Sequence, residues 1–479
     1  MRLASRTRHR FRARLLAVLA VTLSSALPVT PVTAQAQPVP GSNGIGDAYF
    51  PLDGNGGIDV HRYRIHNRYR FATGRLSGTT RVTGTTTEHL SSFNLDFLLP
   101  VKRVRLNGSW VDFSRPSRHE LRIEPSRALP EGSRFAATIH YAGHPDRRGY
   151  LGERNWLADR HEVVAMNQPH MAPWWFPAND HPSDKALMDI AVTVPRGTQV
   201  FANGARVGRE HRDGLVTHRW RAAEPMSTYL AMFAAGDFRV DSGMRDGLPW
   251  RAVVSRQLSR PQQRANMDLM RRTPRVVAGL ERDLGDYPFT RVGGLVTGLD
   301  VGFALENQTL PTYPATGRGF TWLVVHEIAH QWFGDSVGLR RWKDIWLNEG
   351  AATFMEVRWE ETHGGQSGAA WLRSAYNRSP AEGSFWDLTI GDPGADQIFA
   401  GPVYDRGAMT FQALRNRIGE DDFWSLLQRW VSEKRHGLGT REEFEAMAED
   451  VSDEELGPFF RVWLDQDRKP ADVAANGLG

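Results

Sequence analysis

The chain has 479 residues, of which 41% are hydrophobic and 24% are charged, a composition typical of a soluble globular protein with two or three domains. Positions 1–36 hold six arginines and no acidic residue, so without them the formal net charge changes from +4 to 4 − 6 = −2, and charge gives no support to a nucleic-acid partner. Cysteine is absent, which excludes disulfides, a lipoprotein anchor and thiolate metal ligands.

The N-terminus has the pattern of a secretory signal peptide. Six arginines precede an apolar run over residues 15–27, and Ala34-Gln35-Ala36 offers a cleavage site with small residues at its first and third positions. The apolar run is shorter than the roughly 17 to 25 residues that a membrane-spanning helix needs. We therefore expect a signal peptide over residues 1–36 with cleavage after Ala36, a secreted protein and no stable membrane anchor.

The next part of the chain is predicted to be a leader followed by strands. Residues 37–57 are rich in Pro, Gly and Ser without periodicity, which predicts a flexible leader. Short alternating polar and apolar runs then recur between turn residues, which predicts strands. These runs include residues 60–65, 79–87, 93–97 and 101–106. We expect an N-terminal β-rich domain over residues 58–245.

The pattern changes to helices after residue 245. Residues 261–284 place apolar side chains at helical spacing, and one more extended stretch is expected over 294–310. Later helices are predicted around residues 406–418, 421–433, 440–450 and 455–465. Thr440 and Glu443 form a capping-box pattern at the start of the third of these helices. We expect a mainly helical domain over residues 246–470 and a tail over 471–479.

A metal-binding pattern lies in this helical part. His326 and His330 are four residues apart, so they project from one helical face and can chelate one ion, although a histidine pair alone also fits a helix surface. Glu349 follows nineteen residues after His330, on the next predicted helix. Catalytic zinc takes three protein ligands and leaves a position for water. The sequence therefore predicts one zinc ion held by His326, His330 and Glu349.

Glu327 is the predicted general base. It points about 100° round the helix from His326, so it cannot easily bind the same ion but can reach a water on the metal. In this role it takes a proton from the zinc-activated water and passes it to the leaving amine.

These motifs resemble the two zinc-binding blocks of the aminopeptidase N family of zinc peptidases, the gluzincin family that also includes leukotriene hydrolase. Residues 326–335 and 346–350 are similar to the two blocks, with eighteen residues between His330 and Glu349. The resemblance covers most of the chain after about residue 55. It implies an α+β multidomain fold with a saddle-like all-β N-terminal domain followed by a thermolysin-like catalytic domain. It also implies a short member without the C-terminal helical domain of longer members, and hence a more open active site.

The resemblance further implies residues that bind the substrate. Residues 304–307 are similar to the family's exopeptidase signature, in which Ala304 belongs to the substrate site and Glu306 binds the free α-amino group through a charge-assisted hydrogen bond. The signature usually opens with glycine, but Phe303 stands at that position. Gln168 falls on a position that also contacts the amino terminus. Tyr404 falls on the tyrosine that stabilises the tetrahedral intermediate.

Together these patterns predict a secreted zinc metalloaminopeptidase that hydrolyses the N-terminal bond of peptides. The alternatives are a zinc endopeptidase, an epoxide hydrolase acting on a lipid, and a peptide-binding protein with a dead site. Glu306 argues against internal cleavage, and Glu327 with Tyr404 argues against a dead site. Export suits peptide scavenging better than lipid hydrolysis. The pattern does not indicate the preferred N-terminal residue, the physiological substrate or the oligomeric state.

Overall fold

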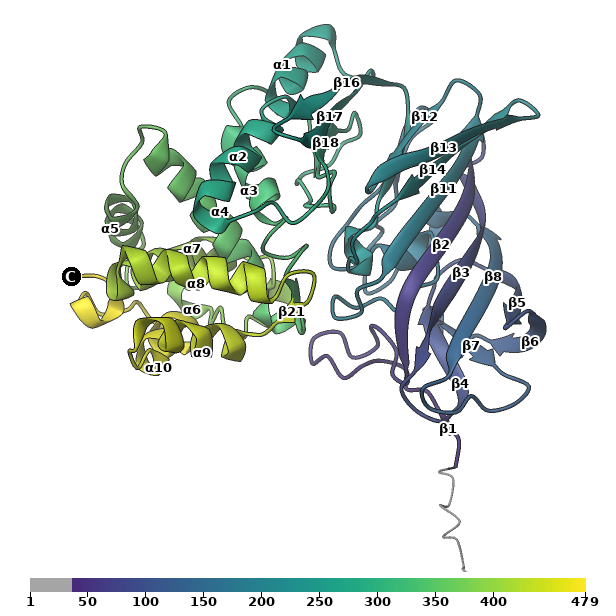
Figure 1. Ribbon diagram of the computed structural model, residues 1–479, viewed down its shortest axis with the longest axis horizontal. Coiled ribbons are helices and arrows are strands. Elements are labelled where there is room, and N and C mark those ends of the chain that lie inside the picture. Colours follow the sequence, from purple (N-terminus) through teal and green to yellow (C-terminus); the bar gives the residue numbers. More distant parts are fainter. Residues whose placement is uncertain (1–36) are drawn as a thin grey trace, which may run out of the picture. The chain divides into compact units, whose positions relative to one another are not determined.

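The computed structural model describes residues 37–479, so the predicted signal peptide and its cleavage site lie outside the described residues. Strands dominate the first half of the described chain and helices dominate the second half (Figure 1). This confirms the predicted α+β fold, with an N-terminal β-domain followed by a mainly helical domain. No helix in this part of the chain is both long enough and apolar enough to cross a membrane.

One eleven-stranded sheet forms the framework of the β-domain, in the order β1-β4-β7-β6-β5-β8-β3-β2-β11-β14-β13. The two longest strands, β2 and β3, are antiparallel neighbours. Buried side chains alternate with exposed ones along most of β2 and with half-buried ones along most of β3, as the period of two predicts. The strands are β1 (Val39–Pro40), β2 (Ile58–Arg70), β3 (Arg75–Thr86), β4 (Leu90–Asp96), β5 (Val101–Leu106), β6 (Ser109–Ser114), β7 (Glu120–Glu124), β8 (Arg134–Gly143), β11 (Leu187–Pro195), β13 (Ala205–Arg212) and β14 (Leu215–Arg221).

The other strands of the described chain form three smaller sheets. One has the order β12-β15-β10-β9, the next β16-β17-β18-β19, and β20 pairs with β21. The predicted domain limit at residue 245 falls at the end of β16, which forms an antiparallel hairpin with β17. The limit itself stays a prediction. These strands are β9 (Leu157–Ala158), β10 (Val163–Ala165), β12 (Gln199–Ala202), β15 (Phe233–Gly236), β16 (Phe238–Arg245), β17 (Leu248–Ser255), β18 (Val292–Val296), β19 (Thr312–Tyr313), β20 (Gly338–Leu339) and β21 (Leu438–Gly439).

Residues 37–57 are not the flexible leader that their composition predicted. The side chain of Asp47 accepts the backbone N–H of Trp342 at 3.2 Å and lies 3.1 Å from His181 Nε2. The backbone N–H of Asn55 donates to Asn179 at 2.5 Å. The segment therefore packs against both halves of the described chain. The composition did not predict this packing, because the contacts are made by single buried polar side chains whose partners are far away in the sequence. Such contacts leave no periodic pattern.

Helices dominate after residue 259. The helical run predicted over 261–284 is divided into α1 and α2, because the ring of Pro274 clashes with the carbonyl four residues earlier, at Met270, and cannot continue the helix. The capping box of Thr440 and Glu443 is present at the start of α9. The helices are α1 (Arg260–Met270), α2 (Thr273–Leu284), α3 (Thr321–Ala329), α4 (Trp346–Thr362), α5 (Gly368–Arg378), α6 (Ser384–Asp387), α7 (Gly401–Ile418), α8 (Glu420–Glu433), α9 (Arg441–Ser452) and α10 (Gly457–Phe460).

Two predicted segments differ in detail from the structure. The extended stretch expected over 294–310 is a strand only at β18, and the chain then forms a loop. The helix expected to end at residue 465 continues from α10 through a π-helical turn at Arg461–Asp465. The tail over 471–479 packs on the helical domain, since Trp463 Nε1 donates to the carbonyl of Asn476 at 3.1 Å and Leu478 is buried.

A buried histidine between two carboxylates stabilises the β-domain. His170 Nε2 lies 2.5 Å from Asp53 Oδ2, and its Nδ1 lies 3.2 Å from Glu153 Oε2. Burial disfavours the imidazolium, but the two carboxylates outweigh burial and raise the pKa of His170 to about 10 from its ordinary 6.5. This pairing therefore stabilises the fold fully below about pH 6.5, and the stabilisation is lost as the pH rises through about 10.

We expect His170→Gln to lower the free energy of unfolding by about 3 kcal/mol near neutral pH, because it leaves the buried carboxylate of Asp53 without its cation. The difference in melting temperature between wild type and variant should shrink as the pH is raised from about 7 to about 10. Thermal unfolding followed by circular dichroism at several pH values checks this. A difference that stays constant over that range would contradict the assignment of a charged His170.

Candidate metal centre and active-site cavity

Two of the predicted metal ligands lie in or at the C-terminal end of α3, an apolar helix whose second half is buried. The α3 sequence is apolar on nearly all sides, and the residues of its second half, 324–329, are buried, as expected for a helix surrounded by other elements. His326 lies in this buried part, and His330 is the C-terminal cap of the same helix. Glu349 lies in the first turn of α4. Two neighbouring helices therefore supply all three predicted ligands.

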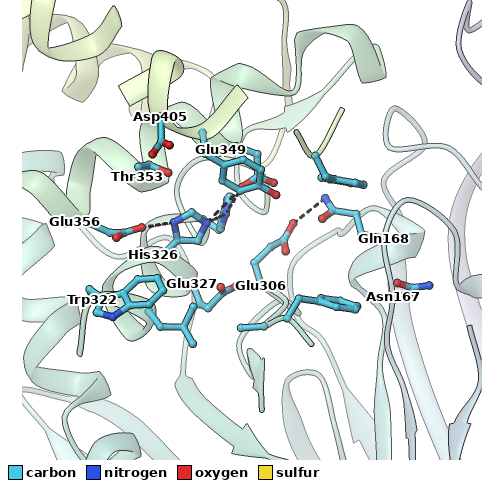
Figure 2. A pocket seen from close by; sticks show the side chains of 16 residues that line it. Asn167, Gln168, Glu306, Trp322, His326, Glu327, Glu349, Thr353, Glu356 and Asp405 are labelled. Atoms are coloured by element: carbon cyan, nitrogen blue, oxygen red, sulfur yellow. Dashed lines mark hydrogen bonds and ion pairs between the residues drawn. The ribbon is translucent and has the colours of Figure 1, made fainter. Parts of the chain in front are cut away.

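The three ligand atoms converge on one point. His326 Nε2 lies 3.1 Å from His330 Nε2, and Glu349 Oε2 lies 3.4 Å and 3.3 Å from those two nitrogens. Ligands at zinc bond lengths in a tetrahedral arrangement lie roughly 3.3 Å apart. Figure 2 shows His326 and Glu349 together on the wall of the cavity. The donor types and their spacing therefore fit one zinc ion.

Both histidines are oriented by their other ring nitrogen. His326 Nδ1 lies 2.7 Å from Glu356 Oε1, and His330 Nδ1 lies 3.0 Å from the carbonyl oxygen of Phe333. Such contacts hold the proton on Nδ1 and leave Nε2 free to bind a metal. Glu356 was missed by the sequence reasoning. Its signal is its place on α4 seven residues after Glu349, which is two turns along the same face.

Glu327 lies beside the ligands and lines the cavity, although its carboxylate is not one of the three converging donors. Its side chain is buried. Burial raises the pKa of Glu327 to about 8, with Glu306 adding to the rise and the two histidines opposing it. A cation at the metal centre would favour the ionised form. The carboxylate is therefore placed where it can exchange protons.

Glu306 forms a second buried carboxylate on the cavity wall. Gln168 Nε2 donates to Glu306 Oε1 at 3.1 Å, and the hydroxyl of Tyr229 also hydrogen-bonds with this carboxylate. The backbone carbonyl of Glu306 accepts a hydrogen bond from Gln331 at 3.0 Å. Burial raises the pKa of Glu306. The structure thus brings Glu306 and Gln168 together and adds Tyr229, which no motif indicated because it lies far away along the chain.

Tyr404 and Ala304 are the remaining predicted site residues. The Tyr404 ring centre lies 6.0 Å from that of His326, with 23° between the ring planes. Burial, followed by the charges of nearby carboxylates, raises the pKa of Tyr404, so its phenol stays protonated and can donate a hydrogen bond. Ala304 lines the same cavity. All eight predicted site residues therefore line one cavity of about 590 Å³.

A close helix crossing sets the distance between the two sides of this cavity. A Cβ atom added at Gly407 of α7 would lie 2.7 Å from the Cα atom of Gly350 in α4, and one added at Gly350 would lie 2.8 Å from the Cα atom of Gly407. The two glycines let the helix backbones touch. Glu349 directly precedes Gly350, and Tyr404 lies three residues, or about one helical turn, before Gly407. The crossing therefore places both side chains on the cavity.

We expect Gly407→Ala to destabilise the protein by about 1–3 kcal/mol, because the added methyl group forces α4 and α7 apart. Catalytic efficiency should fall as Glu349 moves. The melting temperature and kcat/KM measure these effects. Gly401→Ala is the matched control on the same helix, since a Cβ there meets nothing within 4 Å. Equal stability of the two variants would show that the crossing tolerates a side chain.

Two family descriptions match the chain. Residues 61–230 match the Peptidase M1 N-terminal domain, and residues 311–463 match the Peptidase family M1 domain. Among curated relatives, a leucyl aminopeptidase of Saccharolobus solfataricus is 23% identical over 439 residues, covering 85% of this chain and 53% of the relative. The chain spans about half or less of the length of the curated relatives that it matches.

Solved structures agree over nearly the whole described chain. The M1 zinc metallopeptidase of Deinococcus radiodurans, in a variant bound to a Tyr-Ser-Ala substrate, is 27% identical with a TM-score of 0.78, covering 90% of this chain and 100% of that chain. A two-domain M1 zinc metallopeptidase bound to L-arginine is also 27% identical with a TM-score of 0.81 and the same coverage. With both family domains in order and the three ligands converging, the chain belongs to the M1 family of zinc metallopeptidases, the aminopeptidase N family.

Proposed function

We propose that the protein is a zinc aminopeptidase that releases the N-terminal residue of peptides with a free amino terminus. One observation carries this proposal: the buried carboxylate of Glu306 lies in the same cavity as the three metal donors. A buried carboxylate favours an ammonium partner. In a peptide, the free N-terminus supplies that ammonium next to the first peptide bond, whereas an internal amide has none.

The proposed chemistry is peptide hydrolysis at the metal centre. His326, His330 and Glu349 would hold the zinc ion, which supplies a Lewis acid for the scissile carbonyl when bound. Glu327 accepts a proton from the attacking water and then donates it to the leaving amine. The Tyr404 hydroxyl donates a hydrogen bond to the oxygen on which negative charge develops.

The amino terminus of the substrate is held by Glu306 on the wall of the same cavity. Glu306 supplies the charge, and Tyr229 orients its carboxylate through a hydrogen bond. Gln168 contacts Glu306 (Figure 2) but is a neutral amide, so recognition of the ammonium charge depends on Glu306. Ala304 belongs to the wall beside it. The known ligands of the two structural neighbours, a tripeptide and an amino acid, are consistent with this class of substrate.

Glu306→Gln tests the amine-binding role. We expect kcat/KM for aminoacyl amides with a free amine to fall about 100-fold, since a hydrogen bond to a charged group is worth roughly 1.5–3 kcal/mol. Zinc content should be unchanged, because Glu306 is not one of the converging donors. Kinetics on a free and an N-acetylated version of one substrate provide the measurement.

The control for this variant is Glu88→Gln, which changes an exposed carboxylate in the β-domain and should leave kcat/KM unaltered. Full activity of Glu306→Gln on the free-amine substrate would remove the amine-binding role. Cleavage of the acetylated peptide at the same rate by wild type would indicate an endopeptidase.

We also propose that the protein is secreted, from the arginine-rich and apolar pattern before Ala36. Expression of the full chain in a bacterium, followed by mass spectrometry of the protein outside the cytoplasm, provides the test. A mature N-terminus at Gln37 is the expected result. Retention of the intact N-terminus inside the cell would contradict both the cleavage and the export.

A further inference from the structure

A second cluster of metal-binding side chains lies in the β-domain, outside the catalytic cavity. Asp96 is the last residue of β4, Glu120 is the first residue of β7, and the two are directly opposite each other in this antiparallel pair. His119 immediately precedes Glu120. The three side chains bring one ligand atom each to within 4.8 Å of one another. None of the three lines the catalytic cavity.

The burial of this cluster makes its charges costly. Exposure is 0% for Asp96, 1% for Glu120 and 3% for His119, so water does not screen them. Like charges directly opposite on one face of a sheet repel each other even at an exposed position. A buried carboxylate without a cation is more costly still.

Most polar atoms of the cluster also lack a hydrogen-bond partner among the described residues. Asp96 Oδ2 accepts the backbone N–H of Asp180 at 2.6 Å. The other five atoms, which are Asp96 Oδ1, both carboxylate oxygens of Glu120 and both ring nitrogens of His119, are buried without a hydrogen-bond partner among the described residues. Each such atom costs roughly 1–3 kcal/mol. Five such atoms in one place make the cluster costly unless a further group binds there.

The two arginines whose charges favour the ionised form of Glu120, Arg115 and Arg122, do not donate hydrogen bonds to it. The guanidinium of Arg115 donates to the backbone carbonyls of Phe97, Leu99 and Arg118. The guanidinium of Arg122 donates to Asn94 at 3.4 Å. Both side chains therefore have other acceptors, and the carboxylate of Glu120 accepts no hydrogen bond from either of them.

The distances match those of a metal site. His119 Nδ1 lies 3.5 Å from Asp96 Oδ1 and 3.6 Å from Glu120 Oε1. These distances are longer than ordinary hydrogen bonds, fall within the range of weak ion pairs, and are close to the roughly 3.3 Å between ligands on one zinc ion. The catalytic donors lie 3.1–3.4 Å apart. The His119 ring is fixed by stacking on Tyr150, with ring centres 3.8 Å apart and planes at 4°. The nitrogen is thereby held between the two carboxylates.

The surroundings add negative charge. Asp180, whose backbone contacts Asp96, is buried and has one carboxylate oxygen without a hydrogen-bond partner in the described chain. A further buried carboxylate therefore lies beside the cluster of Asp96, His119 and Glu120, and it adds to the attraction for a cation.

We propose that Asp96, His119 and Glu120 form a second metal site that binds a zinc-class divalent cation and fastens β4 to β7. One imidazole nitrogen with two carboxylate oxygens suits Zn²⁺ better than Ca²⁺ or Mg²⁺, which prefer oxygen ligands alone. Two carboxylates balance the charge of the ion, and the neutral imidazole supplies the third ligand. Because the site is buried away from the catalytic cavity, its role is structural.

The test is to count zinc in a protein whose catalytic site cannot hold it. The mature chain carrying both His330→Ala and Glu349→Gln is expressed in zinc-supplemented medium, desalted and analysed by mass spectrometry for metal content. We expect one equivalent of zinc in this variant and two in wild type. Stripping the variant with a chelator should lower its melting temperature, and adding Zn²⁺ back should restore it.

Two further variants locate the second ion. His119→Ala combined with Glu120→Gln should hold one equivalent and keep peptide hydrolysis. The matched control, His218→Ala, removes a buried histidine of β14 that belongs to neither cluster and should keep two equivalents. Absence of zinc from the catalytic double variant, with a melting temperature that chelator and Zn²⁺ leave unchanged, would overturn the second site. That outcome would leave the aminopeptidase proposal intact, since hydrolysis is measured separately on wild type.

Discussion

Replacing Glu327 with glutamine is expected to lower kcat for aminoacyl amides by about 1,000-fold, within the range that general acid–base catalysis contributes. Zinc content should equal that of wild type. Glutamine keeps the size of the buried side chain but cannot accept the proton of the attacking water. The three converging donors, His326, His330 and Glu349, are unchanged. Steady-state kinetics together with metal analysis of the same preparation measure both parts.

The matched control for Glu327→Gln is Glu360→Gln, which alters an exposed carboxylate on α4 and should retain wild-type turnover. Loss of zinc from Glu327→Gln would mean that this carboxylate is needed to hold the metal. Wild-type turnover in Glu327→Gln would mean that another group acts as the base. Retained zinc with strongly reduced kcat is the combination that the proposed role requires.

Glu349→Gln is expected to remove the catalytic zinc and to lower kcat/KM by at least about 1,000-fold, since a bound metal contributes several kcal/mol of transition-state stabilisation. An amide is a much weaker zinc ligand than a carboxylate, and two histidines alone leave the site incomplete. The measurement is zinc content and kcat/KM before and after adding Zn²⁺. The variant should contain one equivalent less than wild type.

Chelation provides the comparison for Glu349→Gln. A zinc chelator should reduce wild-type activity to the level of the variant, and added Zn²⁺ should restore wild type but not Glu349→Gln. Rescue of Glu349→Gln by zinc to full activity would show that Glu349 is dispensable as a ligand. Chelator-resistant hydrolysis by wild type would contradict a metal-dependent reaction altogether.

The metal ligands were predictable because their signal is local. His326 and His330 share one helical face, and Glu349 follows in the next helix, so short spacings along the chain report proximity in space. Glu306 and Gln168 have no such signal, since their contact joins a loop of the helical domain to the β-domain. Only the resemblance to a known family could pair them.

Other long-range contacts could not be predicted from the sequence for the same physical reason. Tyr229 reaches Glu306, and Asp47 reaches Trp342, through single long-range contacts that leave no periodicity. For this reason, the composition of residues 37–57 predicted a flexible leader. The break between α1 and α2 is different, because Pro274 was visible in the sequence and its clash with the preceding turn predicts the interruption.

The cluster of Asp96, His119 and Glu120 shows a further limit. Asp96 and Glu120 become neighbours only through the pairing and register of β4 and β7. Alternation within one strand shows which residues share a face, but not which residues of another strand they oppose. In sequence, Asp96 is one polar residue at the end of a strand. Its burial beside a second carboxylate is a property of the folded sheet.

The most direct test of the proposed function is hydrolysis of fluorogenic aminoacyl amides and their N-acetylated counterparts by a protein comprising residues 37–479, with and without a zinc chelator. We predict chelator-sensitive cleavage that is confined to substrates with a free amine. Equal cleavage of free and acetylated substrates would contradict the aminopeptidase proposal and indicate an endopeptidase. Absence of cleavage across the panel would contradict it as well and favour a lipid substrate or a binding role.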